Sequence, residues 1–319
     1  MIPPLTPAPG LERLSLNTAT VRAGLLETVE VCARARVPWI APWRQQLAEV
    51  PVRTAARAIA DAGLRVSSLC RGGFFPAPSE RERRERLDDN LRALDEAAEL
   101  GAEVLVLVCG GVVGRDLEGS RRMVEDGIAA LLEPAAARGV RLGIEPLHPM
   151  FAADRSVVVT LGQANDIAER LASPWAGVVV DVYHVWWYPA VEAEIARARG
   201  RILGFHVNDW IVPLPDVLNG RGMMGDGVID LRRLRRCADA AGYAGPIEVE
   251  IFNEAVRALG LERALDDLGM LQQDIDRFYR TSRLNARVIS LRNAVLAASI
   301  VARSAWANPE SHGCHYRED

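Results

Sequence analysis

The 319-residue sequence contains no lysine, because all 38 of its basic side chains are arginine. Arginine stays protonated in proteins and cannot act as an amine nucleophile. Schiff-base aldolase chemistry, covalent attachment of pyridoxal phosphate and the P-loop each require a lysine amine. The absence of lysine therefore excludes these three kinds of chemistry, and no pyridoxal phosphate is expected.

Cysteine is also scarce: the chain has five, scattered and without a CxxC pair. This usage is typical of reduced thiols in a cytoplasmic protein rather than of a disulfide framework or a zinc knuckle. The first residues lack the charged and apolar regions of a signal peptide. No uncharged apolar run reaches about 18 residues, so we predict no membrane span. A cytoplasmic protein without membrane contact is expected.

A surplus of basic charge is missing as well. The 38 arginines are outnumbered by 42 acidic residues, which gives a formal net charge of −4. Nucleic acid is therefore not an expected partner. The composition, 49% hydrophobic and 25% charged, is that of an ordinary globular protein with material for a large core.

Up to about residue 275, short apolar runs alternate with segments of helical spacing. The apolar runs are residues 13–17, 38–43, 65–70, 103–111, 141–146, 177–184, 202–209 and 246–252. Eight strand-then-helix repeats predict an α/β fold of the (β/α)8 barrel type, whose usual size is about 250 residues. A doubly wound sheet is the alternative, but no GxGxxG follows the first strand, so no NAD is expected.

Four consecutive strands of this barrel end in a side chain that can bind a metal. RLGIE ends at Glu145, GVVVD at Asp181, ILGFH at His206 and IEVE at Glu250. The C-terminal ends of barrel strands form one face, so the four side chains should converge. Three carboxylates and one imidazole, without a thiolate, favour Mn(II), Mg(II) or Co(II) over a structural zinc site. Each residue alone also fits a helix cap, an arginine partner or a core side chain, but the four together predict a metal site.

Glu248 competes with Glu250 for the last ligand position, because both side chains point to the same face of the strand. Glu250 lies nearer to the end of the strand. We therefore assign the position to Glu250.

The motifs GIEP, VVVDVYH, GFHVND, GMMGDGVIDL and IEVEIF occur in this order and together resemble the sugar phosphate isomerase/epimerase family of xylose isomerase-like TIM barrels. The resemblance covers roughly residues 10 to 275. In ketose 3-epimerases of that family a Glu, an Asp, a His and a Glu, in this order, hold the metal. The resemblance thus implies that Glu145, Asp181, His206 and Glu250 are the ligands, with Mn(II) as the first choice, and that Glu145 and Glu250 are also the catalytic acid and base.

The substrate contacts match that family less closely. After GIEP this chain has LHP, with His148, and the arginine nearest to the metal histidine in the sequence is Arg221 in the glycine-rich loop. The resemblance implies that His184 of the DxxH motif contacts substrate oxygens, helped by Arg221. Trp187 and His148 are further candidates, although tryptophans after strands also pack loops or form dimer contacts. The stretch from Arg71 to Phe75 resembles a substrate loop of the family.

The resemblance implies a divalent-metal-dependent isomerase or epimerase that acts on a sugar or sugar-like polyol by proton transfer through a metal-stabilised enediolate. One alternative is a metal-dependent lyase on the same barrel, like the inosose dehydratases or the C-glycoside-cleaving relatives. Another is a non-catalytic accessory subunit. DNA repair of the endonuclease IV type would need more histidines and a basic groove. The expected partner is a small-molecule sugar or polyol, and a homo-oligomer is left open.

Beyond the barrel the character of the sequence changes. We expect a catalytic barrel domain over residues 1–278 and a C-terminal extension over residues 279–319, read as an extra helix followed by a polar tail. The ending ESHGCHYRED is similar to the C-terminal end of the aspartate oxidase and fumarate reductase flavoproteins. No flavin-binding glycine fingerprint precedes it, so no FAD is expected.

Overall fold

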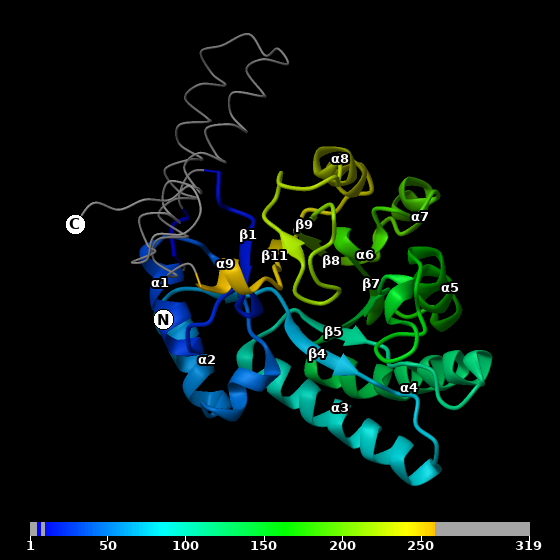
Figure 1. The fold of residues 1–319 in the computed structure, drawn as a ribbon. Coiled ribbons are helices and arrows are strands. Elements are labelled where there is room, and N and C mark those ends of the chain that lie inside the picture. The colour runs from blue at the N-terminus through cyan, green and yellow to red at the C-terminus, as the bar shows by residue number, and fades with distance from the viewer. Residues whose placement is uncertain (1–4, 8–9, 259–319) are drawn as a thin grey trace. The chain divides into compact units, whose positions relative to one another are not determined.

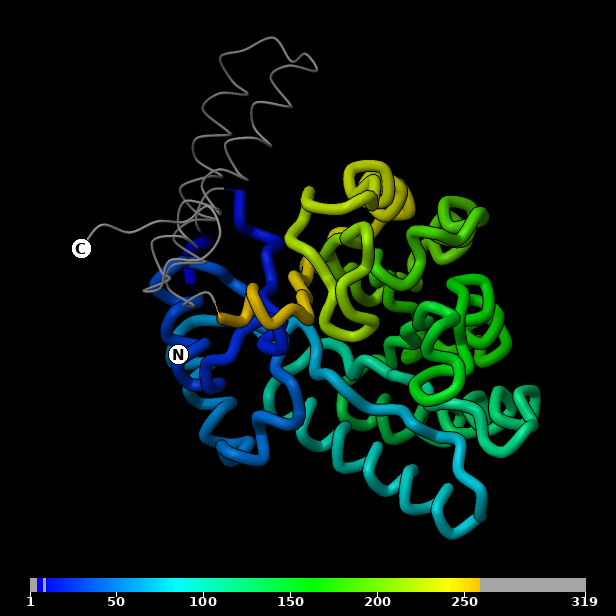
Figure 2. Tube along the Cα trace, in the orientation of Figure 1, coloured from blue at the N-terminus to red at the C-terminus, as the bar shows by residue number. Residues whose placement is uncertain are grey.

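The structure is a computed structural model that describes residues 5–7 and 10–258, and these residues form the predicted barrel. Its strands are β1 (Leu14–Asn17), β2 (Trp39–Ala41), β3 (Arg65–Val66), β4 (Leu69–Gly73), β5 (Val104–Val108), β6 (Arg141–Glu145), β7 (Ala176–Asp181), β8 (Ile202–Val207) and β11 (Ile247–Val249). They pair in the order β3-β2-β1-β11-β8-β7-β6-β5-β4, and every pair is parallel. Because β1 pairs with β11, the beginning and the end of the barrel lie side by side (Figure 2).

One of the predicted strands is split in two. β3 pairs with β2 and β4 pairs with β5, and only Ser67 and Ser68 separate them in the chain. The two pieces are successive parts of a single barrel strand, so the nine strands of the sheet correspond to the eight apolar runs of the sequence. Because β3 and β4 stand at the two ends of the strand order, this interrupted strand closes the barrel.

Helices surround the strands (Figure 1). They are α1 (Leu25–Arg34), α2 (Val52–Asp61), α3 (Glu80–Leu100), α4 (Leu117–Arg138), α5 (Leu161–Leu171), α6 (Val182–Val185), α7 (Val191–Arg197), α8 (Leu231–Ala240) and α9 (Glu254–Ala258), with 3-10 turns at Thr18–Thr20, Arg44–Ala48 and Pro149–Phe151. Local signals fix their ends: α3 begins at the Ser79 cap, whose side chain accepts from the Glu82 amide, and ends at Gly101 in the left-handed region.

The barrel interior changes from apolar to polar along the strands. Val104, Val106, Val179 and Leu203 pack in one buried cluster. Toward the C-terminal strand ends the buried side chains become acidic or basic instead. The strand register sets this layer, because it aligns His206 of β8 with Asp181 on one side and with Glu248 on the other.

A short antiparallel pair covers the C-terminal face of the barrel. β9 (Asp209–Trp210) pairs with β10 (Arg221–Gly222), so the loop that follows β8 returns to the strand ends. The pairing places Arg221 near the predicted metal ligands, although it lies well beyond the strand.

The predicted domain boundary after residue 278 and the C-terminal helix lie outside the described residues, and both stay predictions. In the described part of the chain, no helix combines the length and the apolar character needed to cross a bilayer. The four cysteines within the described residues, Cys32, Cys70, Cys109 and Cys237, are free thiols.

Candidate metal centre and active site

The four side chains predicted as ligands come together at the C-terminal ends of their strands. One potential ligand atom from each of Glu145, Asp181, His206 and Glu250 lies within 4.8 Å of all the others. Each of the four residues is buried, and none is more than 5% exposed. Their neighbouring strands β6, β7, β8 and β11 therefore build one compact group of three carboxylates and one imidazole.

Three atoms of this group lack a hydrogen-bond partner among the described residues. Glu145 Oε1 and both ring nitrogens of His206 are buried without one, although Glu145 Oε1 and His206 Nδ1 lie 3.2 Å apart. A buried polar atom without a partner costs free energy, and a coordinated cation would remove that cost. Carboxylate oxygens and a single imidazole also suit Mn(II), Mg(II) or Co(II). The residues present therefore fit a divalent metal ion.

Arg221 is the main cationic partner of the carboxylates. Its Nη1 lies 2.9 Å from Asp181 Oδ2 and 2.9 Å from Glu250 Oε2. Asn208 donates a further hydrogen bond to Asp181 Oδ1, at 3.0 Å. Burial acts to raise the pKa of Asp181, but Arg221, two histidines and this hydrogen bond outweigh it and hold the pKa well below its usual value. Asp181 is therefore ionised in its buried position.

The pKa values of Glu145 and His206 are both raised, but for different reasons. Burial raises the pKa of Glu145 to about 7, against the lowering effect of His206, while Glu250 and Asp181 add to the rise. Burial also acts to lower the pKa of His206, but the surrounding carboxylates, first among them Glu248, raise it well above its usual value. The excess of carboxylates thus favours a positive charge within the group.

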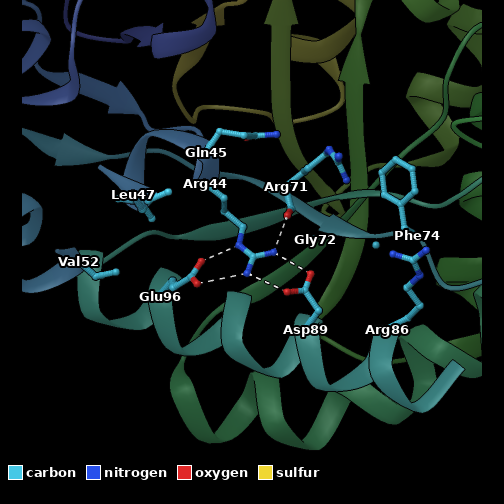
Figure 3. A pocket seen from close by; sticks show the side chains of 12 residues that line it. Arg44, Gln45, Leu47, Val52, Arg71, Gly72, Phe74, Arg86, Asp89 and Glu96 are labelled. Atoms are coloured by element: carbon cyan, nitrogen blue, oxygen red, sulfur yellow. Dashed lines mark hydrogen bonds and ion pairs between the residues drawn. The ribbon is translucent and has the colours of Figure 1, made fainter. Parts of the chain in front are cut away.

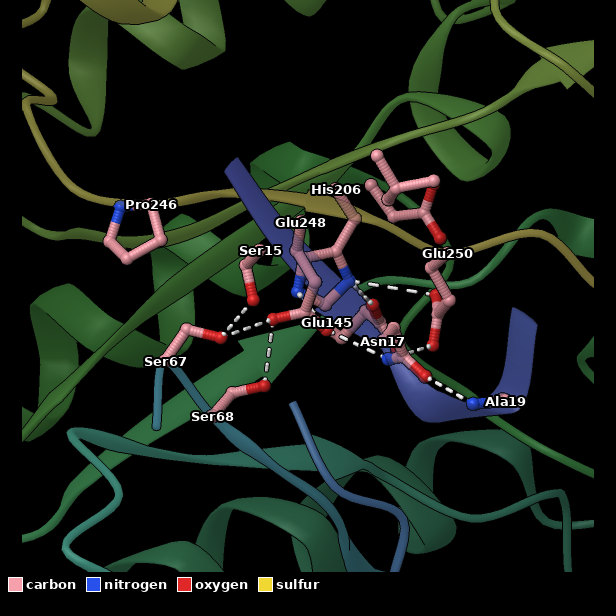
Figure 4. A network of polar contacts seen from close by, with 12 residues as sticks. Ser15, Asn17, Ala19, Ser67, Ser68, Glu145, His206, Pro246, Glu248 and Glu250 are labelled. Carbon is pink, nitrogen blue, oxygen red and sulfur yellow. Dashed lines mark hydrogen bonds and ion pairs between the residues drawn. The ribbon is translucent and has the colours of Figure 1, made fainter. Parts of the chain in front are cut away.

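Glu248 lies next to the group rather than in it (Figure 4). Its Oε2 accepts hydrogen bonds from Ser67 Oγ at 3.1 Å and from Ser68 Oγ at 2.9 Å. Asn17 Nδ2 donates to Glu248 Oε1 at 2.8 Å and to Glu250 Oε1 at 3.0 Å. Glu248 is thus held by neutral donors from β1 and from the break between β3 and β4, and Asn17 joins it to Glu250.

These supporting side chains were not identified from the sequence. Asn17 ends the first apolar run, LSLN, so the argument applied to the last four strands would also have found it. Asn208 lies two residues after a predicted ligand, on the same face of an extended segment. Ser67 and Ser68 carry no such signal, because their role depends on the interruption of the strand.

His184 presents a hydrogen-bond donor beside Arg221. The backbone N–H of His148 donates to His184 Nδ1 at 3.1 Å, so the proton of the neutral ring lies on Nε2. Burial lowers the pKa of His184 to about 3, which keeps the ring neutral. His184 Nε2 lies 3.2 Å from Arg221 Nη2. Two donor groups therefore meet at one point, and an acceptor oxygen placed there would receive a hydrogen bond from each.

Part of this group of side chains lines a cavity of about 200 Å³. Of the predicted site residues, it is lined by Glu145, His184, Arg221 and Glu250. Its aromatic wall consists of Trp43, Phe151, Tyr183 and Phe252. The cavity thus combines apolar surface with a few polar groups at the ligand cluster, as small-molecule sites commonly do.

The two other predicted substrate contacts, His148 and Trp187, pack beside His184. The His148 ring packs against Trp187, with ring centroids 5.3 Å apart, and Trp187 Nε1 donates to the His184 carbonyl at 2.8 Å. Neither side chain is among the cavity-lining residues. The backbone of His148 and the indole of Trp187 hold His184 in place, and direct contact of either residue with a substrate stays a prediction.

The glycine-rich loop after β10 is organised by a carboxylate. Asp209 accepts hydrogen bonds from the backbone N–H groups of Trp210, Gly225 and Ile229, at 2.8, 2.9 and 3.0 Å. These amides are therefore occupied by a side chain of the protein. These hydrogen bonds tie the loop to β9, the strand that pairs with Arg221.

Comparisons with known proteins agree with this architecture. Residues 19–278 match the family model described as xylose isomerase-like TIM barrel. The chain is 31% identical over 255 residues to the 3-dehydroshikimate dehydratase of Pseudomonas aeruginosa, a match that covers 76% of this chain and 38% of that protein. The chain therefore spans less than half the length of this relative.

Two further matches cover more of the other protein. The chain is 28% identical over 203 residues to the L-ribulose-5-phosphate 3-epimerase UlaE of Escherichia coli, covering 62% of this chain and 68% of that one. A crystal structure of a protein from Sinorhizobium meliloti 1021 is 50% identical, with a TM-score of 0.78, and the match covers 81% of this chain and 96% of that one. The proteins that this chain resembles therefore include both an epimerase and a dehydratase.

Proposed function

The chain belongs to the xylose isomerase-like TIM barrel family, and on this premise we propose that it is a divalent-metal-dependent isomerase or epimerase of a sugar or sugar-like polyol. The observation that carries the proposal is the group formed by Glu145, Asp181, His206 and Glu250, whose ligand atoms lie within 4.8 Å of one another. The similarity to an epimerase over 203 residues supports it.

The four residues of this group would hold the ion, with Mn(II) as the first choice and Mg(II) or Co(II) as alternatives. When bound, a divalent ion polarises neighbouring substrate oxygens and stabilises the negative charge that develops as a proton leaves the adjacent carbon. Asp181 and His206 would serve as ligands only, because neither lines the cavity.

Glu145 and Glu250 are the proposed acid and base. Glu145 ends β6 and Glu250 follows β11, with β7 and β8 between them in the sheet, and both line the cavity. Carboxylates from separated strands can approach a substrate carbon from different directions. One can remove a proton and the other can return one. Return to the same carbon inverts its configuration, and return to the neighbouring carbon isomerises the sugar.

His184 and Arg221 would orient the substrate. The two donor groups 3.2 Å apart can share one substrate oxygen, and the backbone of His148 and the indole of Trp187 fix the position of His184. A substrate held in one orientation exposes one carbon to the two carboxylates. Orientation of this kind supplies a large share of enzymatic rate enhancement.

A lyase is the second candidate, and the 31% identity with a dehydratase over 255 residues favours it. The first step would be the same proton removal by Glu145 or Glu250. The second carboxyl group would then protonate the hydroxyl group on the neighbouring carbon, which leaves as water, instead of returning a proton to carbon. The fold and the ligand group serve both outcomes equally.

The test is to incubate the full chain, loaded with Mn(II), with a panel of ketoses in heavy water. Deuterium at carbon without loss of water supports the epimerase or isomerase, whereas loss of water supports the lyase. Bound Mn(II) without either reaction would support an accessory subunit and contradict the proposal. A chain that binds no Mn(II), measured by calorimetry, would overturn the metal centre itself.

A further inference from the structure

The cavity that contains the ligand group is also lined by four arginines, Arg71, Arg155, Arg221 and Arg257. Two of them are engaged within the protein. Arg221 is paired with the buried carboxylates, at 2.9 Å. Arg257 donates to Glu254 Oε1 at 3.0 Å and to a backbone carbonyl at 2.8 Å. Both of these charges are thus already balanced by carboxylates of the protein.

The other two guanidinium groups are far less neutralised. Within the described residues Arg71 has no carboxylate at ion-pair distance, and its guanidinium lies over the Phe74 ring, 4.0 Å from the centroid. The carboxylate nearest to Arg155 is that of Asp154, at 3.7 Å, and the Asp154 side chain is 66% exposed. Burial lowers the pKa of Arg71, and the charge of Arg155 lowers it further, against the opposing effect of the Cys70 thiol. Both arginines line the cavity, so it has two positive charges on its lining.

The backbone that carries Arg71 is held firmly (Figure 3). Arg44 donates to the Arg71 carbonyl at 3.4 Å, and Arg44 is itself fixed by Asp89 at 3.0 Å and Glu96 at 2.6 Å. Asn90 accepts from the Gly73 N–H at 2.6 Å and donates to the Gly73 carbonyl at 2.8 Å. A side chain mounted on a fixed backbone loses less conformational freedom when it binds a ligand.

We propose that this cavity recognises a polyol substrate that carries an anionic group, a carboxylate or a phosphate ester, and that Arg71 and Arg155 bind that group. The planar guanidinium forms paired, charge-assisted hydrogen bonds with either oxyanion. Binding an anion would also remove the repulsion between the two arginines. The inference rests on the proposed function and deepens it, because it specifies the chemical class of the substrate.

The test compares three ligands of the same carbon skeleton: ribose 5-phosphate, ribonate and neutral ribose. Binding to the full chain is measured by calorimetry in chelator, so that no metal contact with the anion contributes. At least one anion is expected to bind about tenfold tighter than ribose, which corresponds to about 1.4 kcal/mol. The phosphate and carboxylate arms identify which oxyanion the site takes.

The variants are Arg71→Gln and Arg155→Gln, with Arg115→Gln, an exposed arginine outside the cavity lining, as the control. Each cavity variant should abolish the preference for the anion while ribose binding stays unchanged, and Arg71→Lys should retain part of the preference. Equal or undetectable binding of all three ligands to the unmodified chain would overturn the inference. So would variants of Arg71 or Arg155 that lose affinity for the anion and for ribose to the same extent. If Mn(II) binding and deuterium exchange persist in that case, the proposed function stands without it.

Discussion

Arg221 and Asp181 form a buried ion pair, with Nη1 of the arginine 2.9 Å from Oδ2 of the aspartate although 40 residues separate them in the chain. The side chains are 6% and 0% exposed. The arginine reaches the site because β9 and β10 return the chain to the strand ends. It compensates the carboxylates from one side, and a divalent cation would compensate them from within the group.

Replacing Arg221 should therefore have a metal-dependent effect on stability. In chelator, Arg221→Gln should lower the free energy of unfolding by about 3–5 kcal/mol, because Asp181 loses its buried cationic partner. Saturating Mn(II) should restore part of the loss, since a bound cation stabilises the same carboxylates. Denaturant unfolding with and without Mn(II) measures both values.

The control for this experiment is Arg170→Gln, which breaks an exposed pair with Glu125 and should have a small effect under both conditions. An Arg221→Gln loss of the same size with and without Mn(II) would show that the arginine and the metal do not share the carboxylates.

Glu248 in β11 and Glu250 just after it offer a matched comparison. Glu250→Gln and Glu145→Gln should slow proton exchange in the substrate by roughly 10²–10⁴-fold, because each removes a proposed acid or base. Glu248→Gln should cost about tenfold, because this side chain only supports the group through its neighbours. Single-turnover exchange of deuterium, with bound Mn(II) quantified in each variant, separates the two roles. A larger effect at Glu248 than at Glu250 would reverse our assignment of the ligand.

Asp89 should make the stability of the Arg71 loop depend on pH. The hydrogen bond from Arg44 holds the pKa of the Asp89 carboxyl below its usual value, against a smaller effect of burial. The stabilisation is then present above the unfolded-state pKa of about 3.9 and is lost as the pH falls through the lower folded value. The difference in unfolding free energy between the unmodified chain and Asp89→Asn should be constant from neutral pH down to about 5 and then shrink. Asp88→Asn, at the adjacent exposed position, should show a smaller difference, and a difference for Asp89→Asn that grows in acid would contradict the argument.

Gly73 should be intolerant of any side chain. Its φ is +103°, and a Cβ built there would lie 2.0 Å from the carbonyl oxygen of Val108. Gly73→Ala should therefore cost about 3 kcal/mol or more through backbone strain and overpacking. Gly101 has a φ of +69° with nothing within 4 Å of such a Cβ, so Gly101→Ala should cost only about 1 kcal/mol. Chemical denaturation of both variants compares them, and equal losses would show that the clash at Gly73 is relieved by movement of the loop.

The sequence by itself determined the alternation of apolar runs and helical segments, the family resemblance and the four strand-end residues that meet within 4.8 Å. These follow from local pattern and from the symmetry of a barrel, in which consecutive parallel strands end on one face. The absence of lysine likewise excluded whole reaction classes without any coordinates.

Only the tertiary structure decided which side chains pair inside that face. It placed Arg221 against Asp181, Asn17 between Glu248 and Glu250, and Arg71 on a wall of the same cavity. Such contacts depend on strand register, on a strand interruption and on the path of a returning loop. Those features arise from packing between segments far apart in the chain, and no local pattern of residues records them.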